Sequence, residues 1–206
     1  MKIVLIGASG FVGSFILSEA LNRGHQVTAI VRNPGKLDQH SNLTSIQADV
    51  FDQDLLVELI AHHDAVISAF SASQLQVQGF QSIIKATKRA KVQRLLVVGG
   101  AGSLKTSSGI DLVDTPEFPK EWKQLALATR EVLKILKSES RLDWIFLSPS
   151  AQLFPGERTL KFRLGKDQLL IDEKGESSIS TEDYAVAMLD ELESPKHIRQ
   201  RFTVGY

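Results

Sequence analysis

Three glycines near the start of the chain have the spacing of a phosphate-binding turn. Gly7, Gly10 and Gly13 follow directly on the apolar run 2–6. In such a turn the first glycine lets the chain leave a strand sharply, and the second lets a pyrophosphate approach the backbone. The third allows close packing of the following helix. The pattern predicts a dinucleotide site, although a glycine turn without a ligand would have the same spacing.

The residues between the glycines complete this predicted phosphate loop. Ser9, Phe11 and Val12 belong to it, and the helix predicted for 11–23 begins inside the motif. Free N–H groups of a first helical turn, together with the helix dipole, favour a bound phosphate. We therefore expect Ser9, Phe11 and Val12 to contact the cofactor together with Gly7 and Gly10.

The end of the next predicted strand, 26–31, indicates which dinucleotide binds. NAD sites usually carry Asp or Glu about 20 residues beyond the glycines, whereas NADP sites have an arginine nearby. This chain has Arg32, then Lys36, and no carboxylate before Asp38. An arginine can bind a phosphate through two N–H donors. The sequence favours NADP over NAD, with a solvated basic loop as the alternative.

These residues would be positioned by alternating strands and helices. Six segments have the pattern of strands: 2–6, 26–31, 42–47, 64–68, 94–98 and 142–147. Helical patterns lie between most of them, which predicts an α/β fold with a Rossmann-type, doubly wound parallel sheet. Ser68, Ala69 and Phe70 would then lie at the carboxyl end of the fourth strand, where open α/β sheets bind ligands.

The sequence pattern changes in the last quarter of the chain. We predict a loop over 148–158, a small hairpin formed by 159–164 and 168–171, a helix over 181–192 and a last strand over 200–204. Residues 149–206 are too few for a core of their own, so we expect a lid within a single domain, 1–206. Before this segment, the helix predicted for 119–136 turns Trp122 and Thr129 inward.

Composition argues against several classes of function. The 206 residues include 24 Lys plus Arg and 24 Asp plus Glu, so the formal charge is zero. No overall field would attract nucleic acid or a membrane, and no apolar run has the length of a membrane span. Cysteine is absent, which fits a reducing compartment. We therefore expect a cytoplasmic protein. We also expect no metal site, because the side chains of the adjacent His62 and His63 do not face one ligand.

Four motifs give the chain a family resemblance. It resembles the atypical short-chain dehydrogenase/reductase group, which contains NmrA-like and NAD(P)H-binding proteins, and within it bacterial NADH-flavin reductases. The motifs are 7–13, 97–103, 155–159 and 175–180 followed by 183–185. The later three together are more specific than the first. The resemblance implies strand order 3-2-1-4-5-6, with cofactor contacts after strands one to six. It also implies a substrate pocket between strand five and the C-terminal segment.

The resemblance also suggests further site residues. It implies cofactor contacts at Asp49 and Val50 after the third strand and at Gly99 after the fifth. Ser103 stands where the family has a Ser or Thr, and it could hydrogen-bond a substrate carbonyl or cap a turn.

Three more side chains could meet a substrate or cofactor in the predicted pocket. Phe154 and Phe70 could stack on a ring or belong to the core. Arg158 could hold an anionic or planar substrate or form a surface salt bridge.

One departure from ordinary short-chain dehydrogenases bears on chemistry. Those enzymes use a Tyr-x-x-x-Lys pair as general acid/base, but here Tyr184 is followed four residues on by Met188. The other tyrosine is Tyr206. Hydride transfer to a flavin or quinone is less demanding, because the acceptor stabilises its own charge.

We therefore expect an NAD(P)H-dependent reductase of a small flavin- or quinone-like acceptor, acting as a monomer or homodimer. Two alternatives remain open at this point. One is a redox-sensing NADP-binding regulator of NmrA type. The other is an epimerase or dehydratase with a bound nicotinamide, which the missing Tyr-x-x-x-Lys pair disfavours.

Overall fold

The computed structural model describes residues 1–206 and is built on one eight-stranded sheet. The strand order is β3-β2-β1-β4-β5-β6-β10-β8, so the predicted order 3-2-1-4-5-6 is confirmed and extended by two strands. Every pairing is parallel except β8 with β10. The strands are β1 (Lys2–Ile6), β2 (Gln26–Val31), β3 (Leu43–Gln47), β4 (Ala65–Ser68), β5 (Arg94–Val98), β6 (Asp143–Ser148), β8 (Arg163–Gly165) and β10 (Gln200–Gly205).

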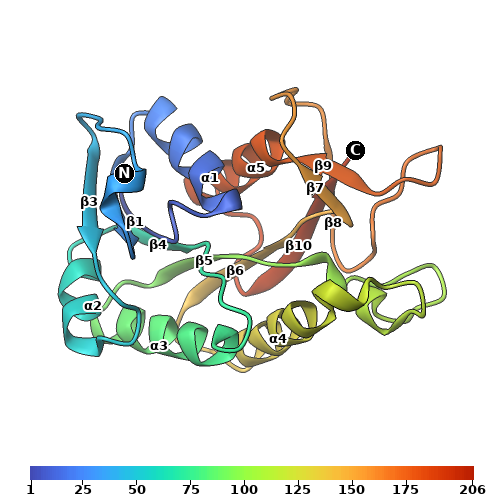
Figure 1. Cartoon of the computed structure of the whole chain (residues 1–206), viewed down its shortest axis with the longest axis horizontal. Helices are drawn as coiled ribbons and strands as arrows, with labels where there is room; N and C mark the ends of the chain where they lie inside the picture. The colour runs from blue at the N-terminus through green and yellow to red at the C-terminus, as the bar shows by residue number, and fades with distance from the viewer.

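Helices cover both faces of the sheet, as a doubly wound fold requires (Figure 1). Two helices cover one face: α1 (Phe11–Asn22) and α5 (Thr181–Glu193). Three cover the other: α2 (Gln53–Ile60), α3 (Gln76–Arg89) and α4 (Lys120–Lys137). Side chains of β1 alternate between the two resulting cores, with Ile3 in the first and Val4 in the second.

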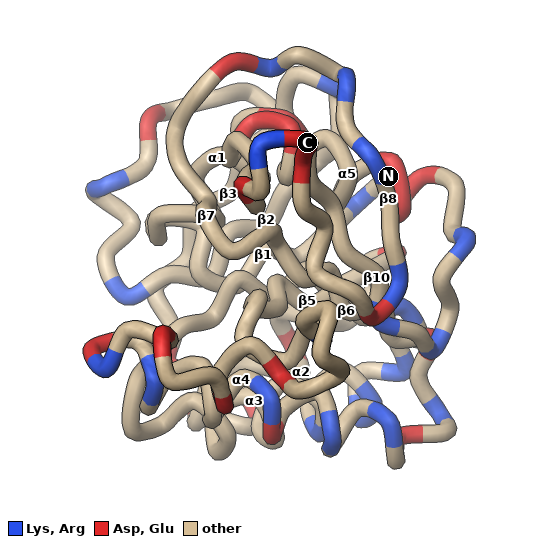
Figure 2. Tube along the Cα trace, turned by 90° about the vertical axis from the view of Figure 1, so that its right-hand side faces the viewer, with Lys and Arg blue, Asp and Glu red and all other residues tan.

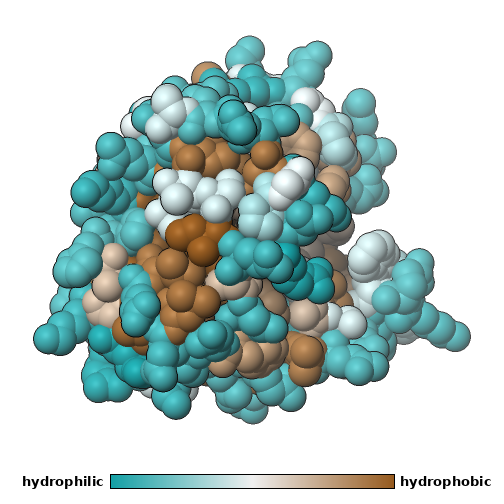
Figure 3. All heavy atoms as spheres, turned by 60° about the vertical axis from the view of Figure 1, so that its left-hand side comes forward, coloured by the Kyte–Doolittle hydropathy of each residue, from teal (hydrophilic) through white to brown (hydrophobic).

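Apolar residues concentrate between the two helix layers. They form two buried clusters, one on each face of the sheet, as expected for a parallel sheet covered by helices on both sides. Figure 3 shows one face of the molecular surface, where an apolar patch lies in the middle and hydrophilic residues surround it. None of the helices combines the length and the apolar character that crossing a lipid bilayer would need.

The predicted hairpin over 159–164 and 168–171 is wrong. Residues Arg163–Gly165 form β8 and pair antiparallel with β10, while Gln168 makes a bridge to Lys105. The edge of β10 beyond β6 offers unpaired N–H and C=O groups, and β8 satisfies them better than a local turn would.

The segment predicted as a loop contains a further strand. β7 (Gln152–Phe154) pairs in parallel with β9 (Ser178–Ser180), and together they form a separate two-stranded sheet. The pairing joins two ends of the C-terminal segment that are far apart in sequence. A local sequence pattern does not reveal such a parallel pair.

The burial that the inward position of Trp122 implies is not found, because this side chain is 61% exposed. Thr129, predicted on the same side of the helix, is buried. The helical period is therefore correct, but the first turn of α4 has no packing partner that covers the indole. Helix periodicity predicts a direction, and it does not predict how far the neighbouring layer extends.

Candidate functional site

The glycine turn after β1 has the backbone conformation that the sequence predicts. Gly7 has a φ of +84°, a region that other residues rarely adopt. Its N–H donates to the Ile30 carbonyl at 3.0 Å, and a Cβ at this position would lie 2.6 Å from the Ala69 carbonyl oxygen. A Cβ at Gly13 would overlap the Gly7 carbonyl. Both glycines are thus required by close backbone contacts.

The first turn of α1 presents free backbone donors. Gly10 precedes the helix, no side chain caps it, and its first turn carries no acidic residue. The N–H groups of Phe11, Val12 and Gly13 find no acceptor within the chain. Unpaired donors at the positive end of a helix form an anion site. The turn therefore fits a pyrophosphate.

Arg32 lies beside this turn, and its guanidinium has no partner within the protein. Gly7 bonds to Ile30, and Arg32 follows two residues later, directly after β2. Its side chain is exposed and makes no hydrogen bond or ion pair. Asn33 accepts a hydrogen bond from Gly35 N–H at 3.1 Å, which orders the short turn Pro34–Lys36. The arrangement leaves Arg32 available to an anionic group bound next to the glycine turn.

The other predicted cofactor residues after β4 and β5 come to the same end of the sheet. Ala69 N–H donates to the Ile6 carbonyl at 2.9 Å, which joins the segment Ser68–Phe70 to the start of the glycine turn. Gly99 N–H donates to the Leu147 carbonyl at 2.8 Å. In Figure 2 the charged residues lie mostly around the rim of this end, and the centre near β1 and β5 carries almost none.

Two of the predicted contacts have side chains engaged in the protein. The ring of Phe70 packs against Gly79 and lies edge-on to Phe80, with 5.9 Å between the ring centroids. The carboxylate of Asp49 accepts the Phe51 N–H at 3.0 Å, and the next residue, Val50, is buried. Phe70 therefore contributes to the packing beneath the site, which agrees with the core alternative rather than the stacking one.

Ser103 is buried and already has a partner. It ends a short turn, Ala101–Ser103, that follows β5. Its hydroxyl and carbonyl lie 3.4 and 3.3 Å from the guanidinium of Arg201 on β10, which donates to both. Arg201 also pairs with Asp167. These contacts favour the structural alternative for Ser103 over a direct contact with substrate.

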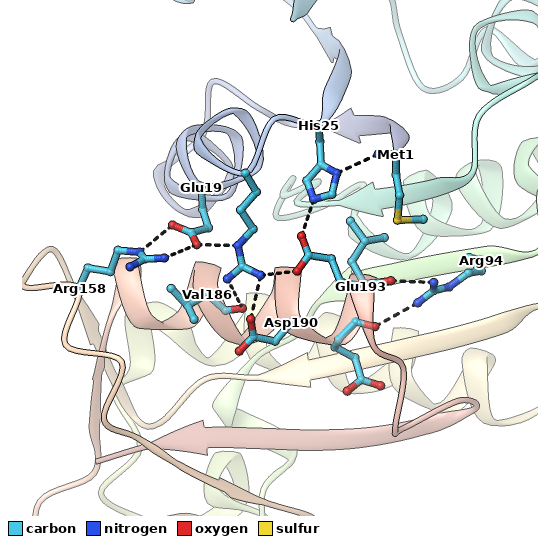
Figure 4. A network of polar contacts seen from close by, with 11 residues as sticks. Met1, Glu19, His25, Arg94, Arg158, Val186, Asp190 and Glu193 are labelled. Carbon is cyan, nitrogen blue, oxygen red and sulfur yellow. Dashed lines mark hydrogen bonds and ion pairs between the residues drawn. The ribbon is translucent and has the colours of Figure 1, made fainter.

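Arg158 forms the salt bridge that was the second of its two alternatives. Its guanidinium donates two hydrogen bonds to the carboxylate of Glu19, at 2.9 and 2.8 Å (Figure 4). Glu19 on α1 is only 4% exposed and also accepts from Arg23 at 2.8 Å. The hydrogen bonds from Arg158 and Arg23 hold the pKa of this carboxyl below its ordinary value. These contacts favour attachment of the C-terminal segment to α1 as the role of Arg158, rather than substrate binding.

The same cluster joins α1 to α5. Arg23 donates to Asp190 and Glu193, both at 2.8 Å, and His25 contacts Glu193 at 2.8 Å (Figure 4). We call Glu19, Arg23, Arg158, Asp190 and Glu193 the α1–α5 ion cluster. The only sequence signal for it is the spacing of Glu19 and Arg23, four residues apart on one helix.

Neither aromatic hydroxyl of the C-terminal segment is available as an acid. Tyr184 is fully buried, and its hydroxyl donates to the Leu147 carbonyl at 2.7 Å. Burial raises the pKa of this phenol far above its ordinary value. The Tyr206 hydroxyl lies 2.9 Å from both Ser180 and Asp183. Phe154 differs from them, because its ring is 41% exposed on β7.

The sheet order, the glycine turn and the free helix donors define a Rossmann-type dinucleotide-binding protein. Residues 7–195 match the family described as NAD(P)H-binding, and the chain belongs to this family. The Bacillus subtilis protein YwnB, described as uncharacterized, is 48% identical to the chain. The match covers 99% of this chain and 98% of YwnB.

Two solved structures are similar over the whole chain. One, from Bacteroides thetaiotaomicron, is described as a "putative epimerase". It is 49% identical, covers 100% of this chain and 96% of its own, and has a TM-score of 0.96. The other, from Streptococcus pneumoniae, is described as a "putative NADH-flavin reductase". It is 37% identical, covers 100% and 99%, and has a TM-score of 0.87. These descriptions differ in chemistry, so the choice between reactions depends on the residues of this chain.

Proposed function

We propose that this protein is an NADPH-dependent reductase that transfers hydride to a flavin- or quinone-like ring. The proposal rests on a built dinucleotide turn, together with the finding that the candidate proton donors Tyr184 and Ser103 are engaged by other groups of the protein. The bound nicotinamide would supply the hydride. The protein would supply orientation and the exclusion of competing reactions.

The preference for NADP rests on Arg32. Its exposed guanidinium has no partner in the chain and follows β2 at the position where the ribose 2′-phosphate of NADP is bound in such folds. A bidentate contact between arginine and phosphate is stronger than an ordinary hydrogen bond. NADH lacks this phosphate, so it would gain nothing from the contact.

The choice of acceptor rests on the engaged hydroxyl groups. Carbonyl reduction and epimerisation need a proton donor within hydrogen-bond reach of the reacting atom. Tyr184 donates to a backbone carbonyl, and Ser103 is bound by Arg201. A flavin or quinone can spread the added charge over its own ring, so it does not need a positioned acid. We place this reaction in the cytoplasm, on a small molecule, in a monomer or homodimer.

A redox-sensing regulator is the second candidate, and the same engaged hydroxyl groups favour it. Such a protein would bind NADPH and NADP⁺ and report their ratio to a partner without turnover. The two candidates differ in one measurable property, which is the steady-state oxidation of NADPH in the presence of an acceptor.

The test measures NADPH oxidation with FMN, riboflavin and menadione as acceptors. We expect turnover with at least one of them, and we expect Tyr184→Phe to change kcat less than about twofold, because this hydroxyl touches no reacting atom. A large fall in kcat for Tyr184→Phe would contradict the mechanism. Tight NADPH binding without turnover would support the sensor instead.

A further inference from the structure

An exposed tryptophan occupies the side of α4 that is otherwise buried. Trp122 precedes Thr129 by seven residues, which is about two helical turns, so both side chains leave the helix in nearly the same direction. Thr129 packs on the turn after β5, where a Cβ at Gly100 would lie 3.4 Å from its methyl group. Ala126, between them, lies against Gly102. Trp122 therefore points toward the sheet side of the helix, yet it is exposed.

The exposure results from the position of Trp122 along the helix axis. α4 runs back along the sheet from the end where the strands finish (Figure 1). Seven residues at 1.5 Å each place Trp122 about 10 Å before Thr129 along this axis. Because Thr129 is level with Gly100, Trp122 lies beyond the carboxyl end of β5. That is the region where an open α/β sheet binds ligands.

The other exposed apolar residue of α4 does not share this position. Leu127 is 37% exposed and lies two residues before Thr129, which places it on the opposite side of the helix. A single exposed leucine facing solvent needs no explanation. An exposed indole beyond the carboxyl end of β5 has a flat apolar surface suited to another planar ring.

We propose that Trp122 is the platform on which the acceptor ring stacks, opposite the nicotinamide site at the end of β5. The inference depends on the proposed function for the identity of the ring, because that function calls for a planar aromatic acceptor. The residue is a binding and specificity determinant, and no proton or electron passes through it.

A kinetic comparison tests the platform. Trp122→Ala should raise KM for menadione or FMN roughly ten- to a hundredfold, since a stacked aromatic pair and its buried area are lost. The kcat at saturation and the KM for NADPH should change little. Trp122→Phe should recover most of the acceptor affinity. Leu127→Ala, an apolar truncation on the opposite side of the same helix, is the matched control and should behave as wild type.

A binding measurement separates the platform from the reaction. The chain has two tryptophans, and the other, Trp144, is only 2% exposed. With NADP⁺ bound, so that no hydride is available, menadione should quench the tryptophan fluorescence of wild type in a saturable way. Trp122→Phe should lose this saturable component, while the absorbance of the quinone affects both proteins equally.

The two experiments distinguish the failure of the platform from the failure of the function. Turnover by wild type with an unchanged acceptor KM in Trp122→Ala overturns the platform and leaves the reductase standing. Saturable quenching that requires Trp122, without turnover, overturns the reductase and leaves a ring-binding platform. Quenching that is absent or independent of Trp122 overturns the platform in either case.

Discussion

Two regions of the molecule use their polar groups in opposite ways. The first is the region that follows β1 and β2, and the second is the C-terminal segment 149–206. In the first region, the N–H groups of Phe11, Val12 and Gly13 and the guanidinium of Arg32 have no partners within the protein. In the C-terminal segment, Arg158 holds Glu19 through two hydrogen bonds. Donors left free are available to a ligand, whereas donors that are paired hold the fold together.

A buried carboxylate in the C-terminal segment shows the same contrast between paired and free polar groups more clearly. Asp183 in α5 has no exposed surface, and its oxygens accept from the Leu160 N–H at 2.9 Å and from the hydroxyls of Thr159 and Tyr206. A buried charge is tolerated when hydrogen bonds replace its hydration. By residue type alone, the C-terminal segment is as suited to chemistry as the glycine turn. The hydrogen-bond partners of the polar residues in the C-terminal segment show that these residues stabilise the fold.

The largest effect should come from filling the free space at the glycine turn. Gly10→Val should weaken NADPH binding by about a hundredfold or more, because the side chain occupies the place of the pyrophosphate. The fold should survive, since a Cβ at Gly10 meets only the Gly7 carbonyl, at 3.2 Å, and its φ of −83° suits any residue. Calorimetric titration of the folded variant measures this, with thermal unfolding as the control.

Gly13→Ala tests whether the conformation of the turn depends on glycine at this position. Its Cβ would overlap the Gly7 carbonyl, so this smaller substitution should disturb the turn itself and lower stability as well as binding. Wild-type affinity in a folded Gly10→Val protein would contradict the assignment of the free donors to a ligand.

The next effect concerns the unpaired arginine. Arg32→Ala should weaken NADPH binding about ten- to a hundredfold, the value expected for a charge-assisted bidentate contact, and should leave NADH binding nearly unchanged. Arg32→Lys keeps the charge without the planar pair of donors and should lie between the two. Equal losses for both dinucleotides would mean that Arg32 has a structural role, like Arg158.

The smallest effect should come from the C-terminal segment, where a paired residue is removed. Arg158→Ala should lower the free energy of unfolding by about 1–2 kcal/mol at neutral pH, because Glu19 keeps Arg23 as a partner. NADPH affinity should not change. Lys161→Ala removes the same charge from an exposed position nearby that forms no ion pair, and serves as the matched control in urea unfolding.

The pH dependence of that difference follows from the lowered pKa of the Glu19 carboxyl. The contribution is fully present above the pKa of the unfolded carboxyl, about 4.3, and is lost as the pH falls through the lower folded pKa. Wild type and Arg158→Ala should therefore converge in stability in acid. A difference that persists there would show that Arg158 acts through packing of its aliphatic stem.

The sequence predicts the elements best where local pattern and long-range pairing agree. The strands from β1 to β6 are buried runs separated by helices, and their positions and order follow from that alternation and the family motifs. The glycine turn is predicted equally well from the sequence, because only glycine accommodates the φ of Gly7 and the close contact at Gly13. These features depend on residues close together in the chain.

The errors arise where a distant segment decides the outcome. The hairpin prediction fails because β8 pairs with β10, about 40 residues away along the chain. The two alternatives for Arg158 could not be separated, because its partner Glu19 lies 139 residues away. Trp122 was placed in the correct direction on α4, but the absence of a covering layer was not visible in the helical period.

The place of β10 in the sheet has a consequence for the order of folding. β10 pairs with β6, and β8 pairs with β10 alone, so the outer part of the sheet can be assembled only after β10 has docked. Pairings between parallel strands distant in sequence form slowly, since loop-closure entropy must be overcome first. The glycine turn, by contrast, contacts only segments that come before β5, namely β1, α1, β2 and Ala69 after β4. A partly folded chain can therefore hold the nucleotide turn in place before the segment beyond β6 has taken shape.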